Sequence, residues 1–146
     1  MAKFEREAEI DAPVERVWEV LINPTYFPQW FPGVESISST DTISEGGSFE
    51  WSSEERTGTG IVEKFIPLKE LKIITQVGDD RDSHLFKLKS IGKVLGLGED
   101  ECKLEYTMDT LSGGGILGRF VTGGNPKDAI QVKKTVHKLR KLVESL

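Results

Sequence analysis

Residues 34–110 consist of short segments in which apolar and polar side chains alternate, with turn residues between one segment and the next. Alternation of period two is typical of strands with one buried face, and no helical periodicity of useful length interrupts it. The pattern predicts six strands, at residues 34–40, 47–56, 58–66, 71–77, 83–91 and 101–110, with turns at 44–47, 67–69, 78–82 and 98–100. Connections this short favour antiparallel neighbours, because a parallel crossover needs about a dozen residues or more.

The segment before residue 34 predicts one further strand and two short helices. Residues 3–10 alternate between an apolar side and a side of glutamates, which indicates a strand with one wet face. Pro13 suits the first turn of a helix whose apolar stripe comprises Val14, Val17, Trp18 and Leu21. Asn23 and Pro24 repeat this start signal, and residues 25–33 then form an elbow dense in aromatic side chains.

The C-terminal segment predicts a long amphipathic helix, with Asn125 as N-cap and Pro126 in its first turn. Its apolar side chains recur at spacings of three and four residues, at Ala129, Val132, Val136, Leu139, Val143 and Leu146. One face of this helix is therefore available for burial. We predict a single α+β domain over residues 1–146, with an antiparallel sheet of about seven strands folded around this helix.

Length and composition are those of a folded globular chain, with 146 residues, 37% hydrophobic and 29% charged. The single cysteine, Cys102, cannot form an intramolecular disulfide, so nothing favours an oxidising compartment. The first residues lack the apolar core of a signal peptide, and no apolar run approaches the roughly 20 residues that span a bilayer. We expect a cytoplasmic protein.

Charge is distributed unevenly. The chain carries 19 basic and 24 acidic side chains, yet residues 126–146 hold six basic against two acidic ones. One interpretation is a solvated helix face, and the other is weak contact of this helix with an acidic partner, RNA or an anionic membrane. No DNA partner is expected.

The order of elements, the segment from Ile10 to Pro24, Trp30 with a proline after it, and Val62 upstream of Pro67 resemble the START and Bet v 1-like (SRPBCC) superfamily, including its polyketide cyclase/dehydrase-like branch. The resemblance implies a helix-grip fold, in which a strongly curved sheet grips the last helix and the two short helices close a cavity between them. It also implies binding of lipids, sterols, quinones or polyketides, with catalysis in some branches.

Inward-facing strand positions, the elbow and a glycine-rich gate at residues 113–124 would line such a cavity. The candidate ligand-binding residues are Phe27, Trp30, Phe31, Phe49, Trp51, Phe86, Leu88, Leu104, Tyr106, Met108, Leu117 and Phe120. Apolar and aromatic walls of this kind suit a small hydrophobic ligand. The alternative interpretation is that these side chains simply fill the core.

Candidates for acid or base chemistry are few: Tyr106, His84 and Glu63. An enzyme built on them would be a cyclase, dehydratase or isomerase without a metal. Nucleotide-binding, nucleophile-elbow and zinc-protease motifs are missing, and two distant histidines with one cysteine do not suggest a zinc site. We therefore expect no cofactor and favour a binding protein over an enzyme.

Overall fold

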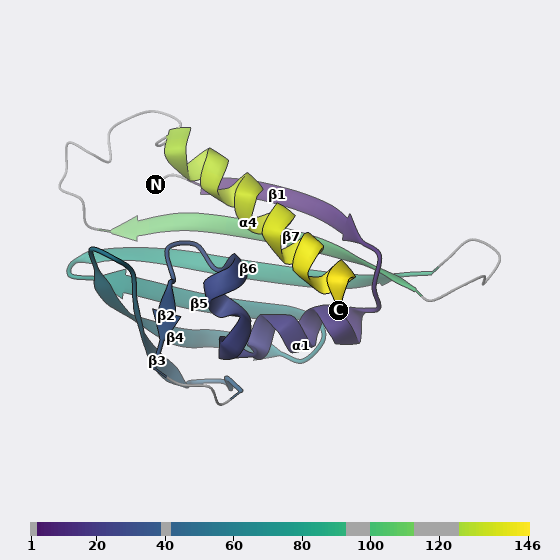
Figure 1. The fold of residues 1–146 in the computed structure, drawn as a ribbon, viewed down its shortest axis with the longest axis horizontal. Helices are drawn as coiled ribbons and strands as arrows, with labels where there is room; N and C mark the ends of the chain where they lie inside the picture. Colours follow the sequence, from purple (N-terminus) through teal and green to yellow (C-terminus); the bar gives the residue numbers. More distant parts are fainter. Residues whose placement is uncertain (1–2, 39–41, 93–99, 113–125) are drawn as a thin grey trace.

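The structure is a computed structural model that describes residues 3–38, 42–92, 100–112 and 126–146. Within these residues, seven strands form one antiparallel sheet in the order β1-β7-β6-β5-β4-β3-β2. The first and last strands are neighbours, and the remaining strands follow as a meander (Figure 1). The predicted antiparallel meander and the α+β class are confirmed.

The strand bounds lie close to those expected from alternation. The strands are β1 (Lys3–Ile10), β2 (Ser36–Ile37), β3 (Ser48–Ser52), β4 (Thr57–Ile66), β5 (Glu70–Val77), β6 (Asp80–Ile91) and β7 (Glu101–Ser112). The inner face carries the apolar members of each strand, so that Trp51 on β3, Phe86 on β6 and Tyr106 on β7 all point toward the core.

The hairpin between β5 and β6 is tighter than the turn predicted at residues 78–82. Val77 pairs with Asp80, which leaves only Gly78 and Asp79 between the strands. Gly78 has φ of 58°, and a glycine at positive φ in the first central position is typical of a type II′ hairpin turn. The prediction was wrong about Asp80 and Asp82, because their turn-like composition concealed two ladder positions of β6.

The segment between β1 and β2 forms α1 (Val14–Ile22), a 3-10 turn η1 (Pro24–Tyr26) and α2 (Phe27–Trp30). Pro13 immediately precedes α1, and the side chain of Asn23 accepts a hydrogen bond from the amide of Thr25 at the start of η1. The two predicted helices after the first strand are thus present. The second is a 3-10 turn joined to a single α-helical turn, because prolines interrupt it.

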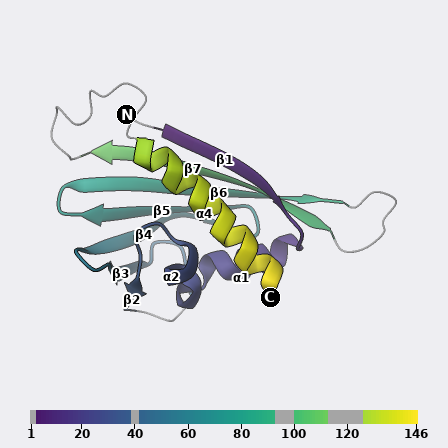
Figure 2. The same ribbon diagram turned by 45° about the horizontal axis from the view of Figure 1, so that its top comes forward.

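The last helix, α4 (Pro126–Ser145), lies across one face of the sheet in both ribbon views (Figures 1 and 2). Val132, Val136, Leu139 and Val143 are buried as predicted, and Thr135 joins them by bonding its hydroxyl to the carbonyl of Gln131. Two residues predicted on this face are exposed: Ala129, in the first turn of the helix, and Leu146, which is 54% exposed because it lies beyond the end of the helix. A hydrogen bond joins the end of α4 to the chain after β1, since the amide of Asp11 donates to Glu144 Oε2 at 2.8 Å.

Two glycines of β4 make room for aromatic rings of β3. A Cβ at Gly58 would lie 2.5 Å from Cζ2 of Trp51, and a Cβ at Gly60 would overlap the ring of Phe49. Both glycines lie directly opposite these aromatic residues in the ladder. The rings therefore lie over β4 itself, in the space that side chains would otherwise fill.

We expect Gly60→Ala to lower the free energy of unfolding by about 1–3 kcal/mol, because the added methyl overpacks against Phe49. Adding Phe49→Leu to the Gly60→Ala chain should recover part of that loss. Chemical denaturation of the two single variants and of the double variant measures these free energies of unfolding. The control is Gly92→Ala, since no described atom lies within 4 Å of that Cβ position. Equal losses at both glycines would contradict this packing.

Candidate functional site

Aromatic side chains fill the centre of the space between the sheet and its helices. Trp30 packs edge-on against Phe86 at 5.4 Å, and Phe86 stacks on Tyr106 at 4.6 Å between ring centroids. Phe27 contacts Phe49 in the same way at 5.6 Å. These rings form a closed core, and none of these five residues is among those lining the cavity described next.

A cavity of about 350 Å³ lies beside this core, near the β5–β6 hairpin. Its walls come from the inner face of the sheet, from the chain after α2 and from Gln131 on α4. Trp51 and Met108 are the two predicted ligand-binding residues in its lining. Polar side chains make up much of the rest, namely Ser53, Arg56, Thr75, Gln76, Asp80, Asp82 and His84. The cavity is therefore more polar than the aromatic pocket expected from the sequence.

Three polar side chains form a buried row across the inner wall. The Nε2 atom of His84 lies 3.0 Å from the hydroxyl of Thr75, and its Nδ1 atom lies 2.7 Å from the hydroxyl of Tyr106. His84 is only 3% exposed, and Phe31 packs edge-on against its ring. Both nitrogens of the imidazole are thus engaged, and its orientation is defined on three sides.

Burial lowers the pKa of His84 to about 3, because the charged imidazolium loses its hydration inside the protein. The imidazole is therefore neutral at pH 7. A neutral imidazole donates through one nitrogen and accepts through the other, which matches one hydroxyl partner on each side. Thr75 and His84 of this row belong to the cavity wall, and their hydrogen bonds fix the positions of their polar atoms there.

The acidic residues of the lining were missed at the sequence level. Asp80 and Asp82 share the inner face of β6 with His84, since they pair with Val77 and Thr75 of the inner face of β5. Extending the period-two alternation of β6 from His84 back to Asp82 and Asp80 would have identified them. Arg56 and Gln131 carry no such signal, because only the folded chain brings the β3–β4 turn and α4 to this cavity.

Other predicted site residues lie elsewhere. The carboxylate of Glu63 forms an exposed ion pair with Lys72 at 3.1 Å, and Leu88 borders a different surface hollow with lysines 69, 87, 89 and 103. Leu104 is fully buried in the core, without a place in the cavity lining. Leu117 and Phe120 lie outside the described residues. The basic side chains of α4 from residue 133 onward are exposed.

Two absences concern only the part of the chain that the structure describes. No group of three or more His, Cys, Asp or Glu residues there is arranged to hold a metal ion. No helix there is both long and apolar enough to cross a membrane.

Burial raises the pKa of the Cys102 thiol to about 11, so this cysteine stays protonated and is a poor nucleophile.

A curved antiparallel sheet that grips a C-terminal helix, with short helices after its first strand, defines a helix-grip domain. The sequence matches the family described as polyketide cyclase/dehydrase and lipid transport over residues 1–144, and the chain belongs to this family. A comparison with curated proteins gives no significant match.

Solved structures share the fold at low sequence identity. Protein MLL2253 from Mesorhizobium loti has a TM-score of 0.72 at 16% identity, with 98% of this chain and 97% of that chain covered. Protein CV1439 from Chromobacterium violaceum has a TM-score of 0.68 at 16% identity, with 97% and 96% covered. DynU16, a protein in the dynemicin biosynthetic locus, has a TM-score of 0.69 at 17% identity, with 99% of this chain and 48% of that chain covered.

Stability should respond to pH through His84. Between pH 6.5 and pH 3 the unfolded chain binds a proton at this residue and the folded chain does not, so the free energy of unfolding falls as pH falls. In His84→Gln this dependence should be shallower by up to about 1.4 kcal/mol per pH unit. Chemical denaturation at several pH values measures the slope, with the exposed His137→Gln as control. Identical slopes for wild type and His84→Gln would show that His84 is not buried in its neutral form.

Proposed function

We propose that this chain binds a small, largely apolar molecule in the cavity between the sheet and α4, with a polar group of the ligand directed toward the hydroxyl of Thr75, which His84 holds in place. One observation carries the proposal: the cavity combines the apolar surfaces of Trp51 and Met108 with a Thr75 hydroxyl that the ordered imidazole of His84 holds in place. Ligand sites typically pair apolar walls with a few placed polar groups, and their volumes begin at about 300 Å³. Membership of a family that includes lipid transport supports the same class of ligand.

An acid–base enzyme is the second candidate, since His84 and Tyr106 lie in hydrogen-bond contact at 2.7 Å. A general base works best when its pKa is near the working pH. The pKa of His84, lowered to about 3 by burial, makes the imidazole a weak base at neutral pH. The geometry therefore supports a role for His84 in holding the Thr75 hydroxyl in place better than a role in removing a proton.

The direct test is organic extraction of the purified protein followed by mass spectrometry, together with thermal unfolding in the presence of 1-octanol as a small apolar probe. A ligand that binds only the folded chain raises its stability by about 2.7 kcal/mol at one hundred times its dissociation constant. We expect a rise in Tm for the wild type. No extracted compound and no rise with 1-octanol would count against the proposal.

Met108→Trp should abolish most of the increase in Tm, because the larger side chain occupies part of a cavity of about 350 Å³. The matched control is Ile61→Trp, which adds the same side chain on the outer face of β4 at a residue that is 50% exposed. A variant with Trp at position 108 that is still stabilised as much as the wild type would place the bound molecule elsewhere.

A further inference from the structure

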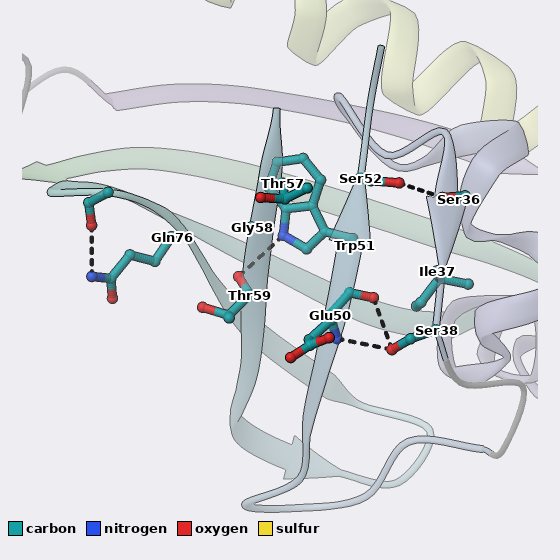
Figure 3. A pocket seen from close by; sticks show the side chains of 11 residues that line it. Ser36, Ile37, Ser38, Glu50, Trp51, Ser52, Thr57, Gly58, Thr59 and Gln76 are labelled. Atoms are coloured by element: carbon teal, nitrogen blue, oxygen red, sulfur yellow. Dashed lines mark hydrogen bonds between the residues drawn. The ribbon is translucent and has the colours of Figure 1, made fainter. Parts of the chain in front are cut away.

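A second hollow lies on the opposite face of the sheet and shares only β3 and β5 with the cavity. It has a volume of about 730 Å³ and lies over β2, β3, β4 and the end of β5 (Figure 3). Its lining includes the outward-facing side chains of Ser52 and Thr57, which belong to the face opposite the buried rings. We call this hollow the hydroxyl groove, because five of its side chains are serines and threonines: Ser36, Ser38, Ser52, Thr57 and Thr59.

The strand register arranges these groups in two rows. Glu50 pairs with Thr59 across β3 and β4, and Thr59 pairs with Gln76 across β4 and β5. A second row runs from Ser36 through Ser52 to Thr57. Directly opposite side chains on one face have Cβ atoms about 4.5–5.5 Å apart. A carboxylate, a hydroxyl and an amide therefore lie side by side on three strands, next to a row of hydroxyls.

The serines are already bonded, but the other members of the rows can accept a ligand. Ser36 and Ser52 bond to each other, and Ser38 bonds to the backbone of β3. The amide nitrogen of Gln76 donates to the carbonyl of Gly78, which leaves its oxygen as an acceptor (Figure 3). Exposed hydroxyls, a carboxylate and an amide oxygen can together receive and donate hydrogen bonds with a hydroxylated molecule.

The charge of the groove limits the class of ligand. Among the described residues that line it, Glu50 is the charged one, and no lysine or arginine is present. Phosphate and sulfate groups are bound chiefly by Arg, Lys and clusters of backbone amides. The groove is therefore suited to an uncharged, hydroxylated group such as a sugar or polyol, and is unsuited to an anionic head group.

The hydroxyl groove and the cavity are neighbours. Trp51 and Gln76 belong to the lining of both. The indole of Trp51 lies over Gly58, where a side chain would collide with it, and its nitrogen donates to the carbonyl of Thr59 at 3.1 Å. Because Gly58 has no side chain, the indole occupies the space over this residue of β4 (Figure 3).

We propose that the cavity and the hydroxyl groove together bind one amphiphile, whose apolar part enters the cavity and whose neutral, hydroxylated head group lies on the rows of Glu50 and Thr57. This inference rests on the function proposed above and adds the chemical class of the head group. Both hollows reach the end of the sheet where the β3–β4 turn and the β5–β6 hairpin lie: Ser52 and Gly78 line the groove there, and Ser53 and Val77 line the cavity. A single molecule that passes round this end can therefore contact both.

Isothermal titration calorimetry below the critical micelle concentration tests this with three probes that share one tail: octyl β-glucoside, octyl phosphate and 1-octanol. We expect wild-type protein to bind octyl β-glucoside about tenfold more tightly than 1-octanol, the factor that one or two net hydrogen bonds provide. Octyl phosphate should show no such advantage. In the double variant Thr57→Val and Thr59→Val, the advantage of the glucoside should fall below about threefold while the affinity for 1-octanol is unchanged.

The control variant is Thr107→Val, which makes the same change on β7 outside the groove and should preserve the advantage. Binding of 1-octanol without any advantage for the glucoside overturns this inference alone, and so does a double variant that behaves like the wild type. An octyl phosphate that binds as tightly as the glucoside also overturns it. If 1-octanol does not bind at all, the proposed function fails, and this inference fails with it.

Discussion

The main constraint on this structure is that the helices are too narrow to cover the whole inner face of the sheet. Seven strands spaced by about 4.8 Å make a sheet roughly 29 Å wide, whereas one helix with its side chains is about 10 Å across. The long helix α4 packs mainly on β1 and β7, and α1 and α2 lie beside it. The remaining inner face has to be covered by large side chains. The aromatic residues of the elbow and of β3 and β6 do this, and the glycines of β4 leave room for the rings of Phe49 and Trp51.

A cavity remains where this covering ends. The rings around Trp30 close the middle of the inner face, but toward the β5–β6 hairpin the strand positions change from aromatic to polar, from Phe86 to His84 and then Asp82. Polar side chains do not pack closely against each other as aromatic rings do, because each polar group requires a hydrogen-bond partner or water. The burial of His84 is tolerated because both of its nitrogens have hydroxyl partners. The same hydrogen bonds hold its ring in place at the wall of the cavity.

Much of the fold could be predicted from the sequence, and much less of the site. Alternation located the strands to within a few residues, and the spacing of Val132, Val136, Leu139 and Val143 identified the buried face of α4. For the cavity, the same pattern identified inward-facing residues but could not separate those that touch each other from those that face open space. Trp51 and Met108 line the cavity, whereas Phe86 and Tyr106 on equivalent positions belong to the closed core.

By itself the sequence determined the class of fold, the antiparallel meander of the strands after residue 34 and the polarity of each strand face, because these follow from local periodicity and from connection length. The place of β1 beside β7 was decided by the tertiary structure. Tertiary structure decided which residues share a space. It brought Arg56 and Gln131 to one cavity, paired His84 with Tyr106 on the neighbouring strand, and made Trp51 part of the lining of two hollows on opposite faces of the sheet. The physical reason is that periodicity specifies the direction of a side chain, whereas a cavity depends on the packing of side chains from distant segments.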